Sequence, residues 1–168
     1  MRQRWSKFRQ LPFRDRALLL AALVMLPAVR VGLRLFGFRR LCRGLAWMTP
    51  SPNLAGENRS AGADLVRARA SALCVRRAAD HGAYRANCLD QSLALWWLLR
   101  LQGIGSEIRI GVRKDAQLEA HAWVEVISIV VNDRDDVGSS FAPFTGPIFS
   151  VSGQARLPRA REPAGDGP

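Results

Sequence analysis

Cysteine is scarce in this 168-residue chain, and the three cysteines present lie far apart in the sequence. Cys42, Cys74 and Cys88 form no CxxC or CxxH pair, which argues against a zinc site, and their odd number argues against a disulfide framework. Unpaired thiols of this kind are typical of a reducing compartment. We therefore expect a cytoplasmic protein that uses neither a metal ion nor another cofactor.

Aromatic residues are also few, at 8% of the chain. Apart from Trp5, Phe8 and Phe13, the basic residues are not interleaved with aromatic side chains on which nucleic acid bases could stack. This pattern argues against a nucleic acid partner. The apolar content of 48% is enough for one domain with its own core, and it excludes collagen-like and wholly disordered chains.

Acidic residues are almost missing from positions 1–48, where eleven lysine and arginine residues stand against a single acid, Asp15. The remaining positions hold fourteen basic and thirteen acidic residues, so nearly all of the net charge of +11 belongs to the N-terminal segment. Such a segment attracts nucleic acid, an anionic membrane surface or an acidic protein through long-range electrostatics. Charge alone leaves the choice among these partners open.

The N-terminal apolar run is short. Residues 17–29 carry no charged side chain, but thirteen positions fall below the roughly 20 that a transmembrane helix needs. No small-residue cleavage site follows the run before the next arginine, so we expect a buried or interfacial helix and not a signal peptide. Pro27 should end or kink this helix. Beyond it, arginines alternate with apolar residues that predict an amphipathic second helix, namely Val29, Leu33, Phe36 and Leu41.

Proline, glycine, serine and asparagine gather in residues 49–62, which is typical of a linker. The chain is therefore predicted to consist of a basic helical N-terminal subdomain (1–48), this linker, and a main domain (63–151). Residues 152–168 are rich in proline, glycine and arginine and are predicted to be disordered.

The main domain begins with two predicted helices. Residues 63–80 show helical spacing and end at His81-Gly82, where glycine is a natural stop. A second helix begins at Cys88, with Asn87 as a candidate N-cap, and continues to Gly103. Its surface is largely apolar, so we expect it at the centre of the fold.

After Gly103 the apolar period changes from 3.6 to 2, which predicts strands over 107–113, 118–126 and 129–131. Lys114–Gln117 is a candidate hairpin turn. The second connection, Ile127-Ser128, lacks the glycine or asparagine expected of a tight turn, so the register of the third strand is the least determined. The fold class is predicted as α+β, with a central helix packed on a small antiparallel sheet.

Three residues of the main domain have positions suited to nucleophilic catalysis. Cys88 lies in the first turn of a helix, where the dipole and free N–H groups favour a thiolate. His121 lies on the strand face opposite the continuous apolar set, where a general base could stand. Asp133 follows the third strand and could orient that histidine, with Asp135 and Asp136 as competitors. A core cysteine, a surface histidine and a turn aspartate are the ordinary alternatives.

In this order, these residues resemble the transglutaminase-like branch of the papain-type cysteine enzymes. More narrowly, CLDQSLALWWLLRLQGIGSEIRIGV, AHAWVEV and VVNDRDDV…FAPF resemble bacterial lasso peptide biosynthesis B2 proteins, over about residues 63–149. The resemblance implies a transglutaminase-like cysteine protease core after the helical N-terminal subdomain. It also implies that Cys88, His121 and Asp133 form the catalytic triad.

The function implied by the resemblance is that of a leader peptidase, a cysteine endopeptidase that cuts the leader from a ribosomally made precursor peptide. B2 proteins work with a small leader-binding B1 protein and pass the core peptide to a lasso cyclase. The backbone N–H of Cys88 would meet the oxyanion, and Asn87 is one candidate for a second donor. The alternatives are an acyl transferase and a non-enzymatic basic adaptor.

The basic N-terminal helices are candidates for docking the partner protein, the leader or a membrane surface. Because the three candidate catalytic residues all lie beyond residue 87, removing residues 1–48 is expected to weaken binding more than it harms the chemistry.

Overall fold

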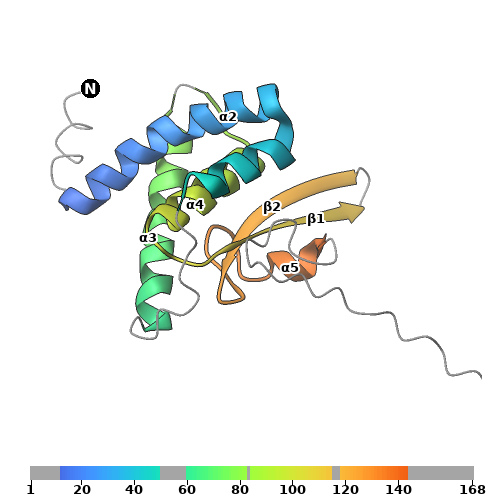
Figure 1. Cartoon of the computed structure of the whole chain (residues 1–168). Coiled ribbons are helices and arrows are strands. Elements are labelled where there is room, and N and C mark those ends of the chain that lie inside the picture. Colours follow the sequence, from blue (N-terminus) through green and yellow to red (C-terminus); the bar gives the residue numbers. More distant parts are fainter. Residues whose placement is uncertain (1–11, 50–59, 83, 115–117, 144–168) are drawn as a thin grey trace, which may run out of the picture.

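A computed structural model describes residues 12–49, 60–82, 84–114 and 118–143 (Figure 1). These contain helices and strands in the order α2 (Phe13–Trp47), α3 (Ala61–His81), α4 (Cys88–Leu101), β1 (Glu107–Lys114), β2 (Leu118–Val126), β3 (Ile129–Val130), α5 (Val137–Ser140) and β4 (Ala142–Pro143). This arrangement confirms the predicted α+β class. Residues 115–117 of the predicted hairpin turn and the predicted tail 152–168 lie outside the described residues.

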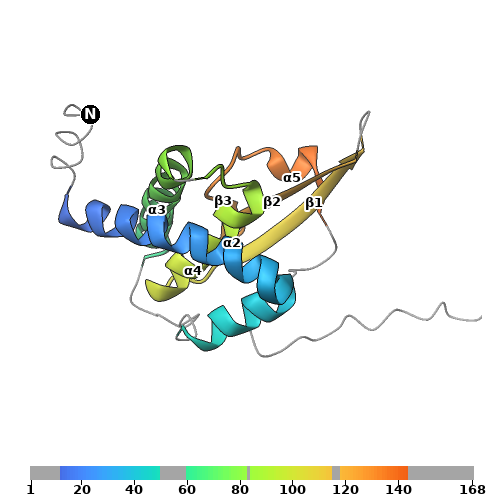
Figure 2. The same ribbon diagram turned by 90° about the horizontal axis from the view of Figure 1, so that it is seen from above.

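The strands form one antiparallel sheet in the order β3-β2-β1-β4. The three long helices cover one face of the sheet, and α5 lies against the other face (Figures 1 and 2). On the helical side, Ile108, Val124 and Val126 are almost fully buried and join the main core. On the opposite side Trp123 is 1% exposed. Both faces of the central strands are therefore covered.

Helix α4 lies at the centre of the molecule, as its apolar sequence predicts. It contacts α2, α3, β1 and β2, and its most buried side chains are Leu93, Leu95, Trp96 and Leu99. Its first turn carries a capping box: Asn87 Oδ1 accepts from the Asp90 N–H at 2.8 Å, and Asp90 Oδ2 accepts from the Asn87 N–H at 3.3 Å. The predicted N-cap role of Asn87 is confirmed.

Helix α2 does not end at Pro27, one of the two outcomes predicted for this proline; its break lies at Gly37. Pro27 lies inside the helix, whereas Gly37 has φ 72° and ψ 169°, a conformation that glycine adopts without steric cost. Packing against the rest of the molecule holds the helical turns around Pro27, because Leu26 and Val29 are buried in the core. This packing outweighs the one backbone hydrogen bond that a proline removes.

The predicted apolar face of the second N-terminal helix is only partly correct. Val29 is buried, and Leu33 and Leu41 are partly buried against the core, but Phe36 is 58% exposed. Phe36 directly precedes the break at Gly37 and is the last residue of the first helical part of α2.

The described part of the N-terminal segment shares one core with the rest of the chain. Leu18, Ala22 and Met25 of α2 belong to the same buried cluster as residues of α3, α4 and the sheet. Helix α2 crosses both other long helices (Figure 2). The boundaries predicted at 49–62 stay a prediction, and α3 begins at Ala61 with Ser60 as its N-cap.

The connection between β2 and β3 is a two-residue turn. Ile127 and Ser128 both have positive φ, 52° and 60°, and the flanking residues pair as Val126↔Ile129 and Glu125↔Val130. The predicted third strand is therefore confirmed. The turn takes the left-handed conformation that hairpins of this length require, although neither residue is a glycine or asparagine.

Candidate active site

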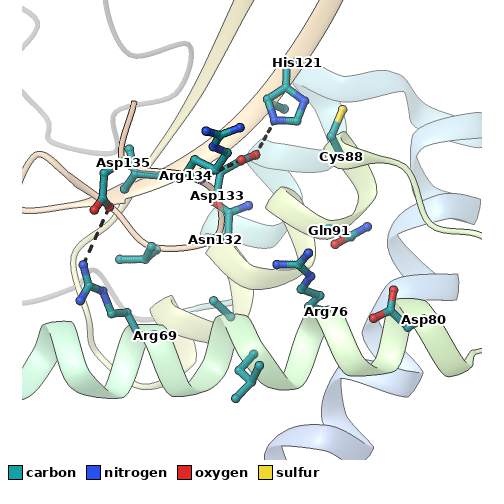
Figure 3. A pocket seen from close by; sticks show the side chains of 15 residues that line it. Arg69, Arg76, Asp80, Cys88, Gln91, His121, Asn132, Asp133, Arg134 and Asp135 are labelled. Carbon is teal, nitrogen blue, oxygen red and sulfur yellow. Dashed lines mark hydrogen bonds and ion pairs between the residues drawn. The ribbon is translucent and has the colours of Figure 1, made fainter. Parts of the chain in front are cut away.

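The three candidate catalytic residues come from three different elements. Cys88 is the first residue of α4, His121 lies in the middle of β2, and Asp133 lies in the segment that follows β3. Cys88, His121 and Asp133 line the same pocket, and Figure 3 shows the Cys88 sulfur and the His121 ring at the same end of it. The fold thus brings together residues that are 45 positions apart in the sequence.

Asp133 holds one side of the His121 ring. Its Oδ2 lies 2.5 Å from His121 Nε2, and its Oδ1 accepts from the Arg134 backbone N–H at 2.8 Å. Both side chains are about a quarter exposed. Because Nε2 is bonded to the carboxylate, Nδ1 is the nitrogen left to exchange a proton with the Cys88 thiol.

The two competing aspartates make other contacts. Asp135 is 86% exposed on its side chain and lies 4.0 Å from Arg69 of α3. Asp136 contacts Arg134 at 3.4 Å. The geometry therefore joins His121 to Asp133 and leaves Asp135 and Asp136 in the outer loop.

Two aromatic rings and a glycine fix the position of the His121 ring. The ring centroids of Trp123 and Phe141 lie 6.4 Å and 5.0 Å from that of His121. Gly111 is paired with His121 across the strands, and a Cβ at Gly111 would lie 2.9 Å from Phe141 Cβ and 3.1 Å from the Ala142 carbonyl oxygen. A glycine at this position lets Phe141 and β4 approach the histidine.

A buried polar cluster joins the three elements that carry the candidate catalytic residues. Ser92 Oγ donates to the Ala122 carbonyl at 2.9 Å and accepts from Asn132 Nδ2 at 3.1 Å. Asn132 Oδ1 accepts from the Val124 N–H at 2.7 Å. Ser92 lies one turn after Cys88, and Ala122 and Asn132 are chain neighbours of His121 and Asp133. The cluster therefore fixes the spacing between the nucleophile, the base and the acid.

The pocket has a volume of about 870 Å³ and lies between α3, the start of α4, and the strands β2 and β3. Helix α3 forms one wall with residues spaced along one face, including Arg69, Arg76 and Asp80 (Figure 3). Leu73 of the same helix also lines the pocket. Gln91 of α4 also faces it. The wall therefore offers charges of both signs and apolar surface to a bound chain.

The other two cysteines are buried in the core. Cys42 is 0% exposed, and its burial raises the pKa of its thiol to about 12. Burial, reinforced by Asp15, also raises the pKa of the Cys74 thiol. Cys88 is the partly exposed cysteine of the three. Within the described residues, no group of three or more histidine, cysteine or acidic side chains could hold a metal ion.

A cysteine at the start of a central helix, in one pocket with a histidine on an antiparallel sheet and an aspartate in the segment after its edge strand, defines the class of papain-like and transglutaminase-like proteins. The sequence model of the Transglutaminase-like superfamily matches residues 32–145, more than half of the chain. The chain belongs to the transglutaminase-like superfamily. Its members are generally enzymes, and the fold includes cysteine peptidases and acyltransferases. Comparison with curated proteins and with solved structures gave no match.

Sequence reasoning identified the three candidate residues but missed the groups that support them. Ser92 and Asn132 could not be recognised from the sequence, because their roles depend on a hydrogen bond between residues 40 positions apart in the chain. The available signal was a serine within the apolar run of α4 and an asparagine directly after a strand. The wall formed by α3 had no signal in the sequence beyond a helical pattern.

Proposed function

We propose that this protein is a cysteine peptidase that removes the leader from a ribosomally made lasso peptide precursor. The observation that carries the proposal is the grouping of Cys88, at a helix N-terminus, with the Asp133-bound His121 in an open pocket. The transglutaminase-like fold supports thiol chemistry of this kind. The narrower substrate is supported by the sequence segments around these three residues, which resemble those of lasso peptide B2 proteins.

The Cys88 sulfur attacks the scissile carbonyl carbon, and His121 takes the thiol proton on Nδ1. The carbonyl oxygen becomes an oxyanion that the free backbone N–H of Cys88 can meet, because the first N–H groups of a helix have no partner within it. When the C–N bond breaks, His121 returns the proton to the leaving amine and a thioester remains on Cys88. Asp133 orients the ring and stabilises its charged form.

Water then attacks the thioester, with His121 as the base, and the cleaved acid leaves the regenerated thiol. The same thioester can instead pass to an amine, which would make the protein an acyl transferase. The difference between the two outcomes is the second nucleophile, so the product decides between them.

The proposed partners follow from the proposed substrate. A small leader-binding B1 protein would present the precursor to this chain, and a lasso cyclase would receive the released core peptide. The pocket wall formed by α3, with apolar Leu73 between charged Arg69 and Arg76, supports binding of an extended peptide beside Cys88.

The proposal is tested by mass spectrometry of a precursor encoded beside this gene, incubated with this protein and the neighbouring leader-binding protein. We expect a free leader and a core peptide, and we expect Cys88→Ala to abolish both products. Cys74→Ala, which removes a buried thiol outside the pocket, is the matched control and should keep cleavage.

Other products would contradict the peptidase assignment. An adduct between the precursor and an added amine would show an acyl transferase. An unchanged precursor, with the protein folded and the partner present, would favour a non-enzymatic adaptor.

A further inference from the structure

Helix α2 carries apolar side chains on both of its faces. One face packs into the core, and the opposite face is open to solvent. The open face, here named the α2 stripe, consists of side chains that are 37–70% exposed, namely Leu20, Leu23, Val24, Val31 and Leu35. Their spacing places them on one side of a helix. A contiguous apolar surface of this kind marks a binding site for protein or membrane.

The same helix is long and apolar enough to cross a membrane by length and composition, with a mean hydropathy of 2.0 over its most apolar window. Contacts to the rest of the molecule oppose a crossing. Arg30 lies 2.9 Å from Asp90 at the start of α4, and the Tyr84 hydroxyl donates to the Leu26 carbonyl at 2.7 Å. These bonds, with the buried face, hold α2 along the surface of the domain (Figure 2).

The exposed charged side chains of α2 are all positive. Arg34 lies beside the stripe, and Arg39, Arg40 and Arg43 follow the break at Gly37; all four are exposed and have no ion pair within the described part of the chain. The single acid of described residues 12–49 is Asp15. Long arginine side chains can reach phosphate groups while their aliphatic stems stay on apolar surface.

This charge pattern indicates whether the α2 stripe binds a second copy of the chain or a lipid surface. A second copy of the chain would bring like charges together, which opposes association. An anionic lipid surface offers both an apolar layer for the stripe and phosphates for the arginines. We propose that the α2 stripe lies in the interface of an anionic phospholipid bilayer, with α2 parallel to the membrane plane. The inference is independent of the chemistry at Cys88.

The test is co-sedimentation of the full chain with vesicles of phosphatidylcholine, with and without phosphatidylglycerol. We expect binding to the mixed vesicles that falls as salt is raised, because screening weakens attraction between exposed charges. The variant Val24→Gln/Val31→Gln/Leu35→Gln should bind on the order of tenfold to a hundredfold more weakly, since three half-exposed apolar side chains no longer enter the lipid. Glutamine keeps the helix propensity, and circular dichroism checks that the variant is folded.

The charge contribution is tested with a matched pair of variants. Arg39→Gln/Arg40→Gln should weaken binding to the mixed vesicles by about fivefold per arginine. Arg77→Gln/Arg85→Gln, which removes the same charge from exposed positions outside α2, should weaken it much less.

Four results would overturn the proposal. The first is absence of binding to mixed vesicles, and the second is equal binding by the stripe variant. The third is lipid-free dimerisation that the stripe variant abolishes, which would assign the stripe to a second copy. The fourth is resistance to extraction by alkaline carbonate, which would show that α2 crosses the bilayer.

Discussion

The reactivity of a thiol depends on its thiolate fraction and its access, and burial lowers both for Cys42 and Cys74. Cys88 is partly exposed at a helix N-terminus beside His121, whereas Cys42 and Cys74 are buried. A thiol whose pKa burial raises to about 12, as for Cys42, has about one thiolate in ten thousand at about pH 8. Access therefore favours Cys88, and burial disfavours the thiolates of the other two cysteines.

We predict that iodoacetamide labels Cys88 in the folded protein at least tenfold faster than Cys42 or Cys74 near neutral pH. Because burial raises the pKa values of Cys42 and Cys74, their labelling should increase as the pH rises toward those values, in addition to any local unfolding. Peptide mapping after timed quenching measures the three rates. Equal rates in folded protein would contradict the assignment of Cys88 as the nucleophile.

The three aspartates after β3 give a second prediction at this scale. Asp133→Asn should lower kcat for precursor cleavage by about 10–100-fold with little change in KM, because the charged form of His121 loses its partner. Asp135→Asn is the control, since the Asp135 side chain is 86% exposed and contacts Arg69 instead. A larger loss from Asp135→Asn than from Asp133→Asn would mean that the loop holds the other carboxylate against His121.

The positions of Cys88, His121 and Asp133 could be predicted because each follows from a local pattern: a helix start, a strand face and a strand exit. The cluster of Ser92 and Asn132 could not, since its bonds form only when α4, β2 and the segment after β3 meet. Local sequence therefore indicates which side chains could react, whereas the contacts that support those side chains depend on the tertiary structure.

At the scale of elements, the turn between β2 and β3 carries conformational strain. Ile127 is β-branched and 59% exposed, yet it has φ 52°, and Ser128 has φ 60°. Residues other than glycine and asparagine take this conformation at a cost of about 1–3 kcal/mol each. We predict that Ile127→Asn/Ser128→Gly, the preferred pair for such a turn, raises the free energy of unfolding by about 1–2 kcal/mol.

Thermal melting of both forms measures this effect, and a gain of that size raises Tm by several degrees. Ser128→Ala is the control, because alanine keeps the strained conformation and should give no gain. An unchanged or lower Tm for the asparagine and glycine pair would contradict the strained turn.

A second prediction at this scale concerns the bond between α2 and α4. Asp90 is 1% exposed, and its carboxylate contacts Arg30 and the Asn87 N–H, while its Oδ1 has no hydrogen-bond partner among the described residues. Arg30→Met leaves this buried carboxylate with one partner fewer. The arginine is itself 36% exposed, so we expect a loss of about 1–3 kcal/mol in the free energy of unfolding, measured in urea.

Arg39→Met is the matched control, because Arg39 is exposed and has no ion pair within the described residues. It should change the free energy of unfolding by less than about 0.5 kcal/mol. Equal effects of the two substitutions would show that the Arg30–Asp90 bond does not stabilise the junction of α2 and α4.

Element positions were more predictable than the break in α2. The ends of α3 and α4 follow from Gly82, Asn87 and Gly103, whose chemistry acts locally. Pro27 also signals a local effect, but packing of its neighbours against α3 and α4 holds the helix through it. Gly37 breaks the helix because its positive φ suits glycine, and a glycine between apolar residues gives no strong signal in the sequence.

At the scale of the whole molecule, the structure bears on how the N-terminal segment relates to the site. Because the candidate catalytic residues lie beyond residue 87, removal of residues 1–48 is predicted to weaken binding more than it harms the chemistry. In the structure, α2 supplies part of the one core that positions α4, and Arg30 contacts the capping residue Asp90 beside Cys88. Sequence alone does not reveal which helices an apolar run packs against.

An aspartate placed on either of two opposite faces of α2 tests whether this helix shares one core with the rest of the chain or belongs to an independent subdomain. Ala22 is 0% exposed among residues of α2, α3 and α4, whereas Val24 is 70% exposed. We predict that Ala22→Asp abolishes cooperative unfolding of the entire chain, because a buried unpaired carboxylate costs more than a domain of this size can lose. Val24→Asp should keep a cooperative transition, since its carboxylate stays in water.

Circular dichroism melting of both variants, followed at a helical wavelength and at the near-ultraviolet signal of the tryptophans, measures the outcome. Loss of both signals in Ala22→Asp would show that α2 folds as one unit with the part of the chain that carries the candidate catalytic residues. The reason is that Trp96 and Trp123 lie in α4 and β2, far from the substitution in sequence. If the near-ultraviolet transition persists in Ala22→Asp, α4 and the sheet fold without α2. In that case removal of residues 1–48 would harm the chemistry at Cys88 less than it weakens binding, which is the sequence-based prediction.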